Sequence, residues 1–387
     1  MHPMRAAVLC TLLLSFLTSG VDCLEARGGK SSSGRSSSGG FGPKPAKILH
    51  TPDTSDSTQA LLKFLKAQKA EGIGNIEIGY DSESGVRGLF ANKNFKQGQI
   101  LCKIPSDCAL ALSDPAKDAE DTPTLAHGGA NFLKMYMKPP NARQLWAPYL
   151  DTLPAMGSAQ FDPTPDFFSD EELELLEFPR LIRQAKERRE QIQKVALETD
   201  LTQEELQFAT WLTASRAFCI SITAPTSEED LEEPKYDERG QIITKAGEQK
   251  TVRVLVPFID MANHNSDQPN AKLSLIDPEK DDAWFALEAT RPIAAGKEIT
   301  IAYGNGVESS AELLLNYGFV PRSNRIDEFM LKKGGGEAIT SLGGWSTTLE
   351  EDKTMLLMME GSDDDATLKK ILRFRIRLKE SYTGSGE

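Results

Sequence analysis

The sequence is poor in the residues that commonly hold metal ions. It has four histidines and five cysteines among 387 residues, and they form neither a His-Glu-x-x-His nor a Cys-x-x-Cys spacing. The phosphate-binding pattern Gly-x-x-x-x-Gly-Lys-Ser/Thr is missing as well. These absences argue against zinc hydrolysis and against nucleotide-dependent phosphoryl transfer, and we expect no bound metal.

Other common patterns are also missing. A Gly-x-Ser-x-Gly nucleophile elbow does not occur, and the glycine-rich stretches do not open a helix within a βαβ unit. The apolar run over residues 6–17 is too short to span a bilayer. The sequence therefore disfavours a serine hydrolase of that type, a Rossmann-type dehydrogenase or methyltransferase, and stable membrane insertion.

The start of the chain predicts targeting segments. Arg5, the apolar run 6–17 and the small residues after it have the layout of a signal peptide over residues 1–23. Residues 26–47 are rich in Ser and Gly, with five basic residues and no acid. Such a composition cannot form a core, so residues 24–54 are predicted to be a disordered leader or a plain linker. A signal followed by a transit-like segment predicts import into a plastid.

Cysteine usage bears on the same question. Beyond the leader only Cys102, Cys108 and Cys219 remain, an odd number without paired spacing. This pattern favours free thiols in a reducing compartment over a disulfide framework. The endoplasmic reticulum lumen or secretion is therefore the alternative location to a plastid.

Charge is distributed unevenly along the chain. The net charge of −13 combines −1 over residues 1–25, +5 over residues 26–49 and −17 over the rest. An acidic body argues against nucleic acid as a partner, because phosphate contacts need clustered Lys and Arg. It suits a basic protein substrate, although acidity can equally serve solubility. The oligomeric state is not indicated, and a monomer is the default.

Hydrophobic periodicity predicts mixed helices and strands. A helix with an apolar face is expected from Ser55, and Ile76, Ile78 and Tyr80 alternate as in a strand. Residues 131–218 are helical in pattern, with an interruption at Pro179 and with Thr202 and Glu205 forming a capping box. Strands are expected over residues 270–276 and 284–289, and an exposed insertion over residues 228–250.

Polar residues gather in one stretch, 254–319. A predicted buried strand over residues 254–259 runs directly into Asp260, Asn263, His264 and Asn265. A second strand over residues 299–303 ends in Tyr303, and a helix from about Ser309, ended by Gly318, follows it. The stretch thus brings amide, imidazole, carboxylate and phenol groups together.

These residues carry a resemblance to a known family. The blocks D-M-A-N-H, I-A-Y-G and A-E-L-L-L-N-Y-G-F follow one another, with R-G-L-F-A, W-A-P-Y-L-D-T-L-P and S-R-A-F upstream. Together they resemble a SET domain of the Rubisco large-subunit methyltransferase-like branch. The resemblance implies a mostly β SET fold, small sheets around a pseudoknot, with a helical insertion and a short helical C-terminal extension, α+β overall. It places the SET domain at 55–320, its insertion at about 130–250, and a shortened substrate-binding extension at 321–387.

The resemblance also implies site residues and a reaction. It implies a protein-lysine N-methyltransferase that uses S-adenosylmethionine without a metal, with Tyr303 as the catalytic residue. The implied donor-binding residues are Gly88, Leu89, Phe90, Arg216, Asp260, Asn263, His264 and Tyr303. The implied substrate-binding residues are Phe218, Ile301, Tyr317 and Phe319.

Alternatives to a lysine methyltransferase stay open at this point. A silent SET-fold module that binds basic tails would not need the donor-site residues. Histidine methylation is disfavoured by Phe218, because a related histidine methyltransferase carries a polar amide there. The predicted leader makes a non-histone protein presenting a lysine the expected partner.

The C-terminal segment ends in a basic helix. Its cations are expected on the solvated face of a packed helix, with contact to an acidic partner as the alternative. These cations are Lys369, Lys370, Arg373, Arg375, Arg377 and Lys379.

Overall fold

The computed structural model describes residues 50–112, 124–223, 235–236, 242–243, 249–278, 283–304, 306–332, 345–359 and 365–383. The predicted signal peptide and most of the predicted leader lie outside these residues, as does most of the expected insertion at 228–250. Ordered structure begins before the predicted boundary at residue 55, because β1 (His50–Pro52) pairs with β2 (Ile76–Asp81). No helix among the described residues is long and apolar enough to cross a membrane.

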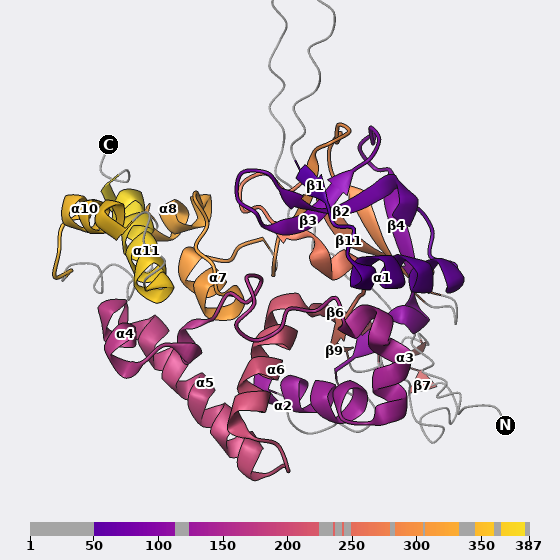
Figure 1. Cartoon of the computed structure of the whole chain (residues 1–387), viewed down its shortest axis with the longest axis horizontal. Coiled ribbons are helices and arrows are strands. Elements are labelled where there is room, and N and C mark those ends of the chain that lie inside the picture. The colour runs from indigo at the N-terminus through magenta and orange to yellow at the C-terminus, as the bar shows by residue number, and fades with distance from the viewer. Residues whose placement is uncertain are drawn as a thin grey trace, which may run out of the picture.

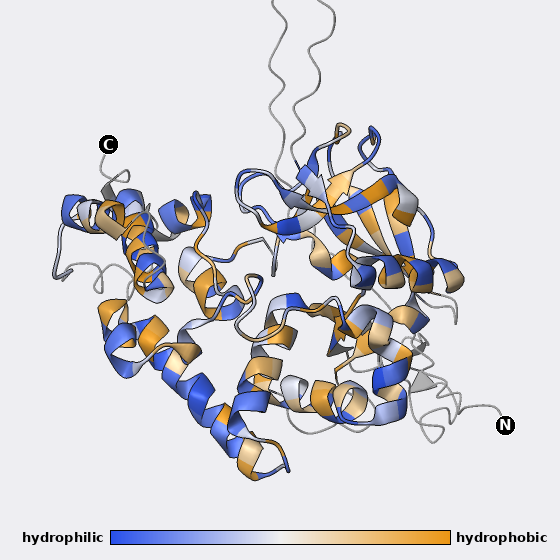
Figure 2. Ribbon diagram, in the orientation of Figure 1, coloured by the Kyte–Doolittle hydropathy of each residue, from blue (hydrophilic) through white to orange (hydrophobic). Residues whose placement is uncertain are grey.

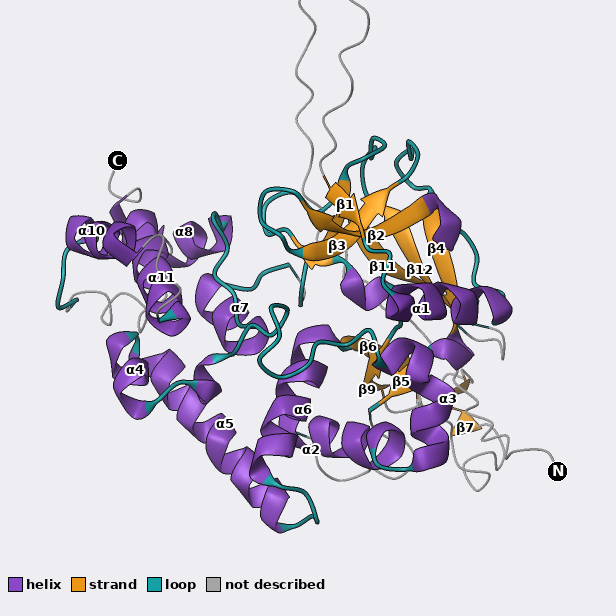
Figure 3. Ribbon diagram, viewed as in Figure 1, coloured by secondary structure: helices purple, strands orange, loops and turns teal. Residues whose placement is uncertain are grey.

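A five-stranded sheet forms one end of the molecule (Figure 3). Its strand order is β1-β2-β3-β13-β10, where the remaining strands are β3 (Arg87–Ala91), β13 (Glu298–Ile301) and β10 (Asn263–His264). The pair β10 and β13 is parallel and only two residues long, whereas the other neighbours in this sheet are antiparallel. Segments from the start, middle and end of the predicted domain therefore meet in one sheet.

Three smaller sheets complete the strand region among the described residues. The first has the order β11-β12-β4 and contains β11 (Ala271–Ile276), β12 (Trp284–Ala289) and β4 (Ile100–Pro105). The second has the order β5-β9-β6 and contains β5 (Leu110–Ala111), β9 (Gln249–Leu255) and β6 (Phe218–Thr223). The third pairs β7 (Lys235–Tyr236) with β8 (Ile242–Ile243). Both strands predicted at 270–276 and 284–289 are confirmed.

Helices occupy the segment between β5 and β6, as expected (Figure 1). The segment contains α2 (Leu125–Phe132), a π-helix (Leu133–Met137), α3 (Pro140–Leu150), a 3₁₀ turn (Pro165–Phe167), α4 (Asp170–Leu175), α5 (Pro179–Leu197) and α6 (Gln203–Arg216). The interruption at Pro179 is confirmed, because Pro179 starts α5. The predicted capping box of Thr202 and Glu205 opens α6. Figure 2 shows that α5 is largely hydrophilic, as its charged sequence predicts.

The main core lies between the sheets and the first helices. Helix α1 (Asp56–Ala67) is capped by Ser55 and buries Leu61 and Leu65 completely against this core. A second core joins α4 and α5 to α7 (Ser310–Tyr317) and α11 (Ala366–Thr383). Because α7 ends beside the polar stretch of the sequence, the second core supports that region from behind.

The strand predicted over residues 254–259 is wrong in its extent. Strand β9 ends at Leu255, and a 3₁₀ turn (Ile259–Met261) follows it. Phe258 has a positive φ of 74° and is fully buried. The chain therefore turns before the polar residues, and a hydrophobic run alone cannot show this because each of its members is buried in either geometry.

The expectation that the cations of the basic terminal helix lie on a solvated face is wrong for three of the six, whereas Arg373 is exposed. Arg375, Arg377 and Lys379 are buried. The fully buried Asp352 of α10 (Leu349–Met359) lies 3.0 Å from Arg375 Nη2 and 2.5 Å from Lys379 Nζ. Asp327 of α8 (Arg325–Lys332) lies 3.4 Å from Arg377 Nε. Buried acids on α8 and α10 neutralise these cations, a pairing that periodicity along α11 does not reveal.

We predict that Asp352→Ala strongly destabilises the C-terminal region. Removal of this carboxylate leaves Arg375 and Lys379 buried without their shared counter-ion. The expected loss in the free energy of unfolding is about 3 kcal/mol, measured by urea denaturation. Glu350→Ala on the same helix is the matched control, because the Glu350 side chain is 83% exposed. Equal stability of the two variants would contradict the prediction.

Candidate functional site

A cavity of about 800 Å³ lies where the five-stranded sheet meets the helical segment. Its walls come from the β2–β3 hairpin, the loop before α4, the end of α6, the 3₁₀ turn with β10, the start of β13 and the end of α7. Its charged and aromatic lining residues are Tyr80, Arg87, Phe161, Asp162, Trp211, Arg216, Asp260, His264, Glu298, Tyr303, Tyr317 and Phe319. Most of the polar residues predicted from the sequence thus share one cavity.

A buried carboxylate defines one end of the cavity. Asp260 lies in the 3₁₀ turn after β9, and its side chain is 0% exposed. Its Oδ2 accepts a hydrogen bond from the Tyr149 hydroxyl at 2.9 Å and lies 3.3 Å from Arg216 Nη1. Burial raises the pKa of Asp260, whereas Arg216 and Tyr149 oppose this shift. The Arg216 guanidinium and the Tyr149 hydroxyl thus partly compensate the cost of burying the Asp260 carboxylate.

Asn263 is fixed by two hydrogen bonds on the neighbouring wall. Its Nδ2 donates to the carbonyl oxygen of Arg87 at 2.9 Å and to Glu298 Oε1 at 2.8 Å. A Cβ at Gly88 would lie 2.6 Å from Glu298 Oε1 and 2.7 Å from Asn263 Nδ2. Only glycine therefore fits at position 88. The side-chain amide oxygen of Asn263 takes no part in these two hydrogen bonds.

His264 is held in one tautomer. Its Nδ1 accepts a hydrogen bond from the backbone N–H of Tyr303 at 2.9 Å. Its Nε2 lies 2.7 Å from Ser266 Oγ and therefore donates to that hydroxyl in the neutral ring. Burial lowers the pKa of His264 to about 4. The ring is neutral at physiological pH and acts as a structural link, not as a base.

The other end of the cavity is aromatic. The ring of Tyr303 lies 4.6 Å from that of Tyr317 and 6.2 Å from that of Phe319, measured between centroids. The Tyr303 hydroxyl donates to the carbonyl oxygen of Ala262 at 3.1 Å. Burial raises the pKa of Tyr303 above its usual range and that of Tyr317 to about 12. Both phenols are therefore neutral at physiological pH.

Five of the predicted residues do not line the cavity: Gly88, Leu89, Phe90, Phe218 and Ile301. Leu89 and Phe90 are buried in β3, and the residue of that strand that lines the cavity is Arg87. Ile301 is buried in the main core, and Phe218 is half-buried at the start of β6. The predicted roles of these side chains stay predictions.

Sequence reasoning missed three residues of this region: Tyr149, Arg87 and Glu298. Tyr149 lies in the W-A-P-Y block and Arg87 opens the R-G-L-F-A block, yet neither was singled out. Glu298 precedes the buried residues Ile299 and Ile301, and burial raises its pKa. A charged residue at the start of a buried strand was the available signal for Glu298.

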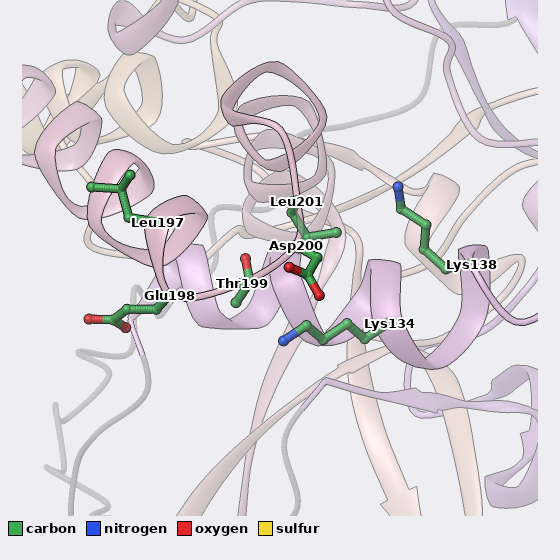
Figure 4. A pocket seen from close by; sticks show the side chains of 7 residues that line it. All are labelled: Lys134, Lys138, Leu197, Glu198, Thr199, Asp200 and Leu201. Atoms are coloured by element: carbon green, nitrogen blue, oxygen red, sulfur yellow. The ribbon is translucent and has the colours of Figure 1, made fainter.

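A second hollow of about 460 Å³ lies at the far end of α5 (Figure 4). It is lined by Lys134, Lys138, Leu197, Glu198, Thr199, Asp200 and Leu201. Lys138 already pairs with Glu205 at 2.7 Å, and Figure 4 shows Glu198 pointing away from the hollow. The hollow gathers no convergent set of reactive groups.

The described residues contain no group of three or more His, Cys, Asp or Glu side chains that could hold a metal ion.

Comparisons with known proteins place this site in a family. Residues 86–304 match the SET domain family. A structure of the SET domain of LSMT bound to methyllysine and AdoHcy is similar, with 16% identity, a TM-score of 0.58, and coverage of 86% of this chain and 91% of that chain. A structure of Rubisco LSMT bound to AdoMet has 15% identity, a TM-score of 0.56, and coverage of 85% and 90%. No curated protein sequence matches. The α+β fold expected from the sequence is confirmed.

We predict a measurable titration at His264. Because the folded-state pKa of about 4 lies below the ordinary value of 6.5, the unfolded state binds the proton more readily at acid pH. Stability should therefore fall as the pH decreases from 6.5 towards 4. Ring-proton NMR, assigned with His264→Gln, should show a midpoint near 4, and a midpoint near 6.5 would contradict this view of the site.

Proposed function

Because the chain belongs to the SET-domain family, we propose that it is a protein-lysine N-methyltransferase that uses S-adenosylmethionine and acts on a non-histone protein. One observation carries the proposal. A single cavity has a charged end, formed by Arg216 and Asp260, and an aromatic end, formed by Tyr303, Tyr317 and Phe319. The two ends suit the two reactants of methyl transfer to an amine.

The charged end fits the amino-acid part of the methyl donor. A guanidinium such as Arg216 can bind a carboxylate through two parallel hydrogen bonds. The buried Oδ1 of Asp260 has no hydrogen-bond partner among the described residues, and such an atom can accept a hydrogen bond from an ammonium group. The donor would supply an electrophilic methyl group bound to a sulfonium. Asn263 and the β10 backbone, which border the same cavity, are proposed to bind its nucleoside part.

The aromatic end fits a lysine side chain. Lysine in water has a pKa near ~10.4, so the attacking amine must lose a proton before it reacts. A channel walled by Tyr303, Tyr317 and Phe319 removes water from the amine and thereby favours its neutral form. The Tyr303 oxygen, held by its bond to Ala262, can orient the amine and accept weak C–H···O contacts from the methyl group. Neither phenol is ionised, so this mechanism assigns neither as a base.

A plastid protein remains the proposed target class, and the proposal depends on the predicted leader. Support comes from the transit-like composition of residues 26–47 and from the unpaired cysteines. The segment 321–387 is proposed to be a shortened substrate-binding extension. Within this segment, buried ion pairs join α11 to α8 and α10, and this suits a support for the channel in place of a large docking surface.

We predict that donor binding depends on the D-M-A-N-H block. Isothermal titration of the purified protein with S-adenosylmethionine should show saturable binding, which the double variant Asn263→Ala, His264→Ala should lose. Asn141→Ala with His127→Ala is the matched control, because it changes the same residue types at exposed positions. A well-folded wild type that does not bind the donor would refute the enzyme proposal.

We predict a separate effect of Tyr303→Phe on turnover. The variant should keep donor binding but lose about 100-fold in transfer of labelled methyl groups, because the amine is no longer oriented. Transfer would be measured on plastid proteins as substrate mixture, followed by hydrolysis and separation of methyllysine from methylhistidine. Donor binding by the wild type without transfer to any protein would favour the silent binding module, and labelled methylhistidine would favour the histidine alternative.

A further inference from the structure

The turn at the end of α3 holds two charged groups of the cavity from outside it. The Tyr149 hydroxyl donates to Asp260 Oδ2 at 2.9 Å, and Arg87 Nη2 donates to the carbonyl oxygen of Thr152 at 2.7 Å. Thr152 Oγ1 closes the turn by donating to the Tyr149 carbonyl at 2.7 Å. Tyr149 itself is fully buried and does not line the cavity. A single turn therefore sets the position of a carboxylate and of a guanidinium.

The two oxygens of Asp260 have different surroundings. Oδ2 contacts both the Tyr149 hydroxyl and Arg216 Nη1. Oδ1 is buried and has no hydrogen-bond partner among the described residues. Burying a polar atom without a hydrogen-bond partner typically costs ~1–3 kcal/mol of stability. Such an atom therefore indicates a ligand that supplies the missing hydrogen bond.

We propose that Tyr149 is a positioning residue for donor binding, which holds Asp260 so that Oδ1 receives the ammonium group of the donor while Arg216 receives its carboxylate. This inference rests on the proposed function and extends it to a residue outside the cavity. The hydroxyl of Tyr149 fixes the rotation of the carboxylate, which the single contact to Arg216 at 3.3 Å would leave free to turn.

The chemistry of tyrosine suits this role. Burial and the neighbouring carboxylate raise the pKa of Tyr149 far above its usual value, so its hydroxyl remains a donor at any physiological pH. Arg216, Arg87 and Tyr303 are the other titratable or charged groups near Asp260, and both arginines favour its ionised form. Tyr149 thus adds a hydrogen bond to the carboxylate without adding a second buried charge.

The test compares two ligands that differ only at the amino-acid end. S-Adenosylhomocysteine carries the ammonium and carboxylate groups, and 5′-methylthioadenosine lacks both. In the full-length protein, Tyr149→Phe should weaken binding of S-adenosylhomocysteine about tenfold, since a hydrogen bond to a charged group is removed. Binding of 5′-methylthioadenosine should change less than twofold. Titration calorimetry measures both.

A matched control and a second variant accompany this comparison. Tyr136→Phe removes the hydroxyl of a half-buried tyrosine, which donates to the Ala111 carbonyl at 2.9 Å, and it should leave binding of both ligands unchanged. Thr152→Val removes the bond that closes the turn and should weaken S-adenosylhomocysteine selectively by about threefold. If Tyr149→Phe does not fold, the binding of the two ligands to Thr152→Val tests the proposal in its place.

A pH series adds a readout that a structural role would not produce. Because the Tyr149 bond lowers the pKa of Asp260, its loss should raise that pKa. The affinity loss caused by Tyr149→Phe for S-adenosylhomocysteine should therefore be larger at low pH than at high pH, and the affinity of Asp260→Asn should not show this dependence.

The outcomes separate this inference from the proposed function. If wild type binds both ligands and Tyr149→Phe weakens neither, or both equally, the positioning role is overturned while the enzyme proposal stands. If the wild type binds neither ligand, the proposed function fails and this inference fails with it. Selective loss of the amino-acid ligand supports both.

Discussion

The hydrogen bond from the Tyr303 N–H to His264 Nδ1 ties β10 to the chain just beyond the end of β13. Strand β10 pairs with β13 over only two residues, so the backbone ladder alone is short. The imidazole extends that ladder past the end of β13 and fixes the backbone from which the Tyr303 phenol projects. A neutral ring is required, because a protonated Nδ1 cannot accept this bond. The low pKa of His264 is thus a condition for the geometry of the site.

Support from behind the cavity comes largely from charged groups that never face it. Asp327 accepts hydrogen bonds from the backbone N–H and the hydroxyl of Ser310, the first residue of α7, and Arg377 of α11 lies beside Asp327. Arg188 of α5 donates to the Leu315 carbonyl at 2.5 Å. Helix α7 carries Tyr317 at its end, so these contacts fix the aromatic wall. The C-terminal helix therefore acts on the channel through α8 and α7 although it does not line the cavity.

Sequence reasoning succeeded where the signal was local. The helix starts at Ser55 and about Ser309, the capping box of Thr202 and Glu205 and the end of α7 at Gly318 follow from neighbouring residues, and all are observed. It failed where a partner lies far away in the chain. The pairing of Arg375 with Asp352 joins two helices across an intervening segment, and the bond from Tyr149 to Asp260 spans 111 residues. Neither periodicity nor charge runs contain that information, and an arginine on a charged helix gives the same local signal whether it is buried or exposed.

Gly88 shows why a motif glycine need not touch a ligand. Its missing Cβ is what lets the Asn263 amide reach both the Arg87 carbonyl and Glu298, because a methyl group would lie within 2.7 Å of each side chain. With both N–H groups of Asn263 occupied in this way, the orientation of its amide is determined before any ligand binds. Glycine in the R-G-L-F-A block is thus required by the protein's own packing. The same packing preorganises the wall that is proposed to bind the donor, and a preorganised wall lowers the entropic cost of binding.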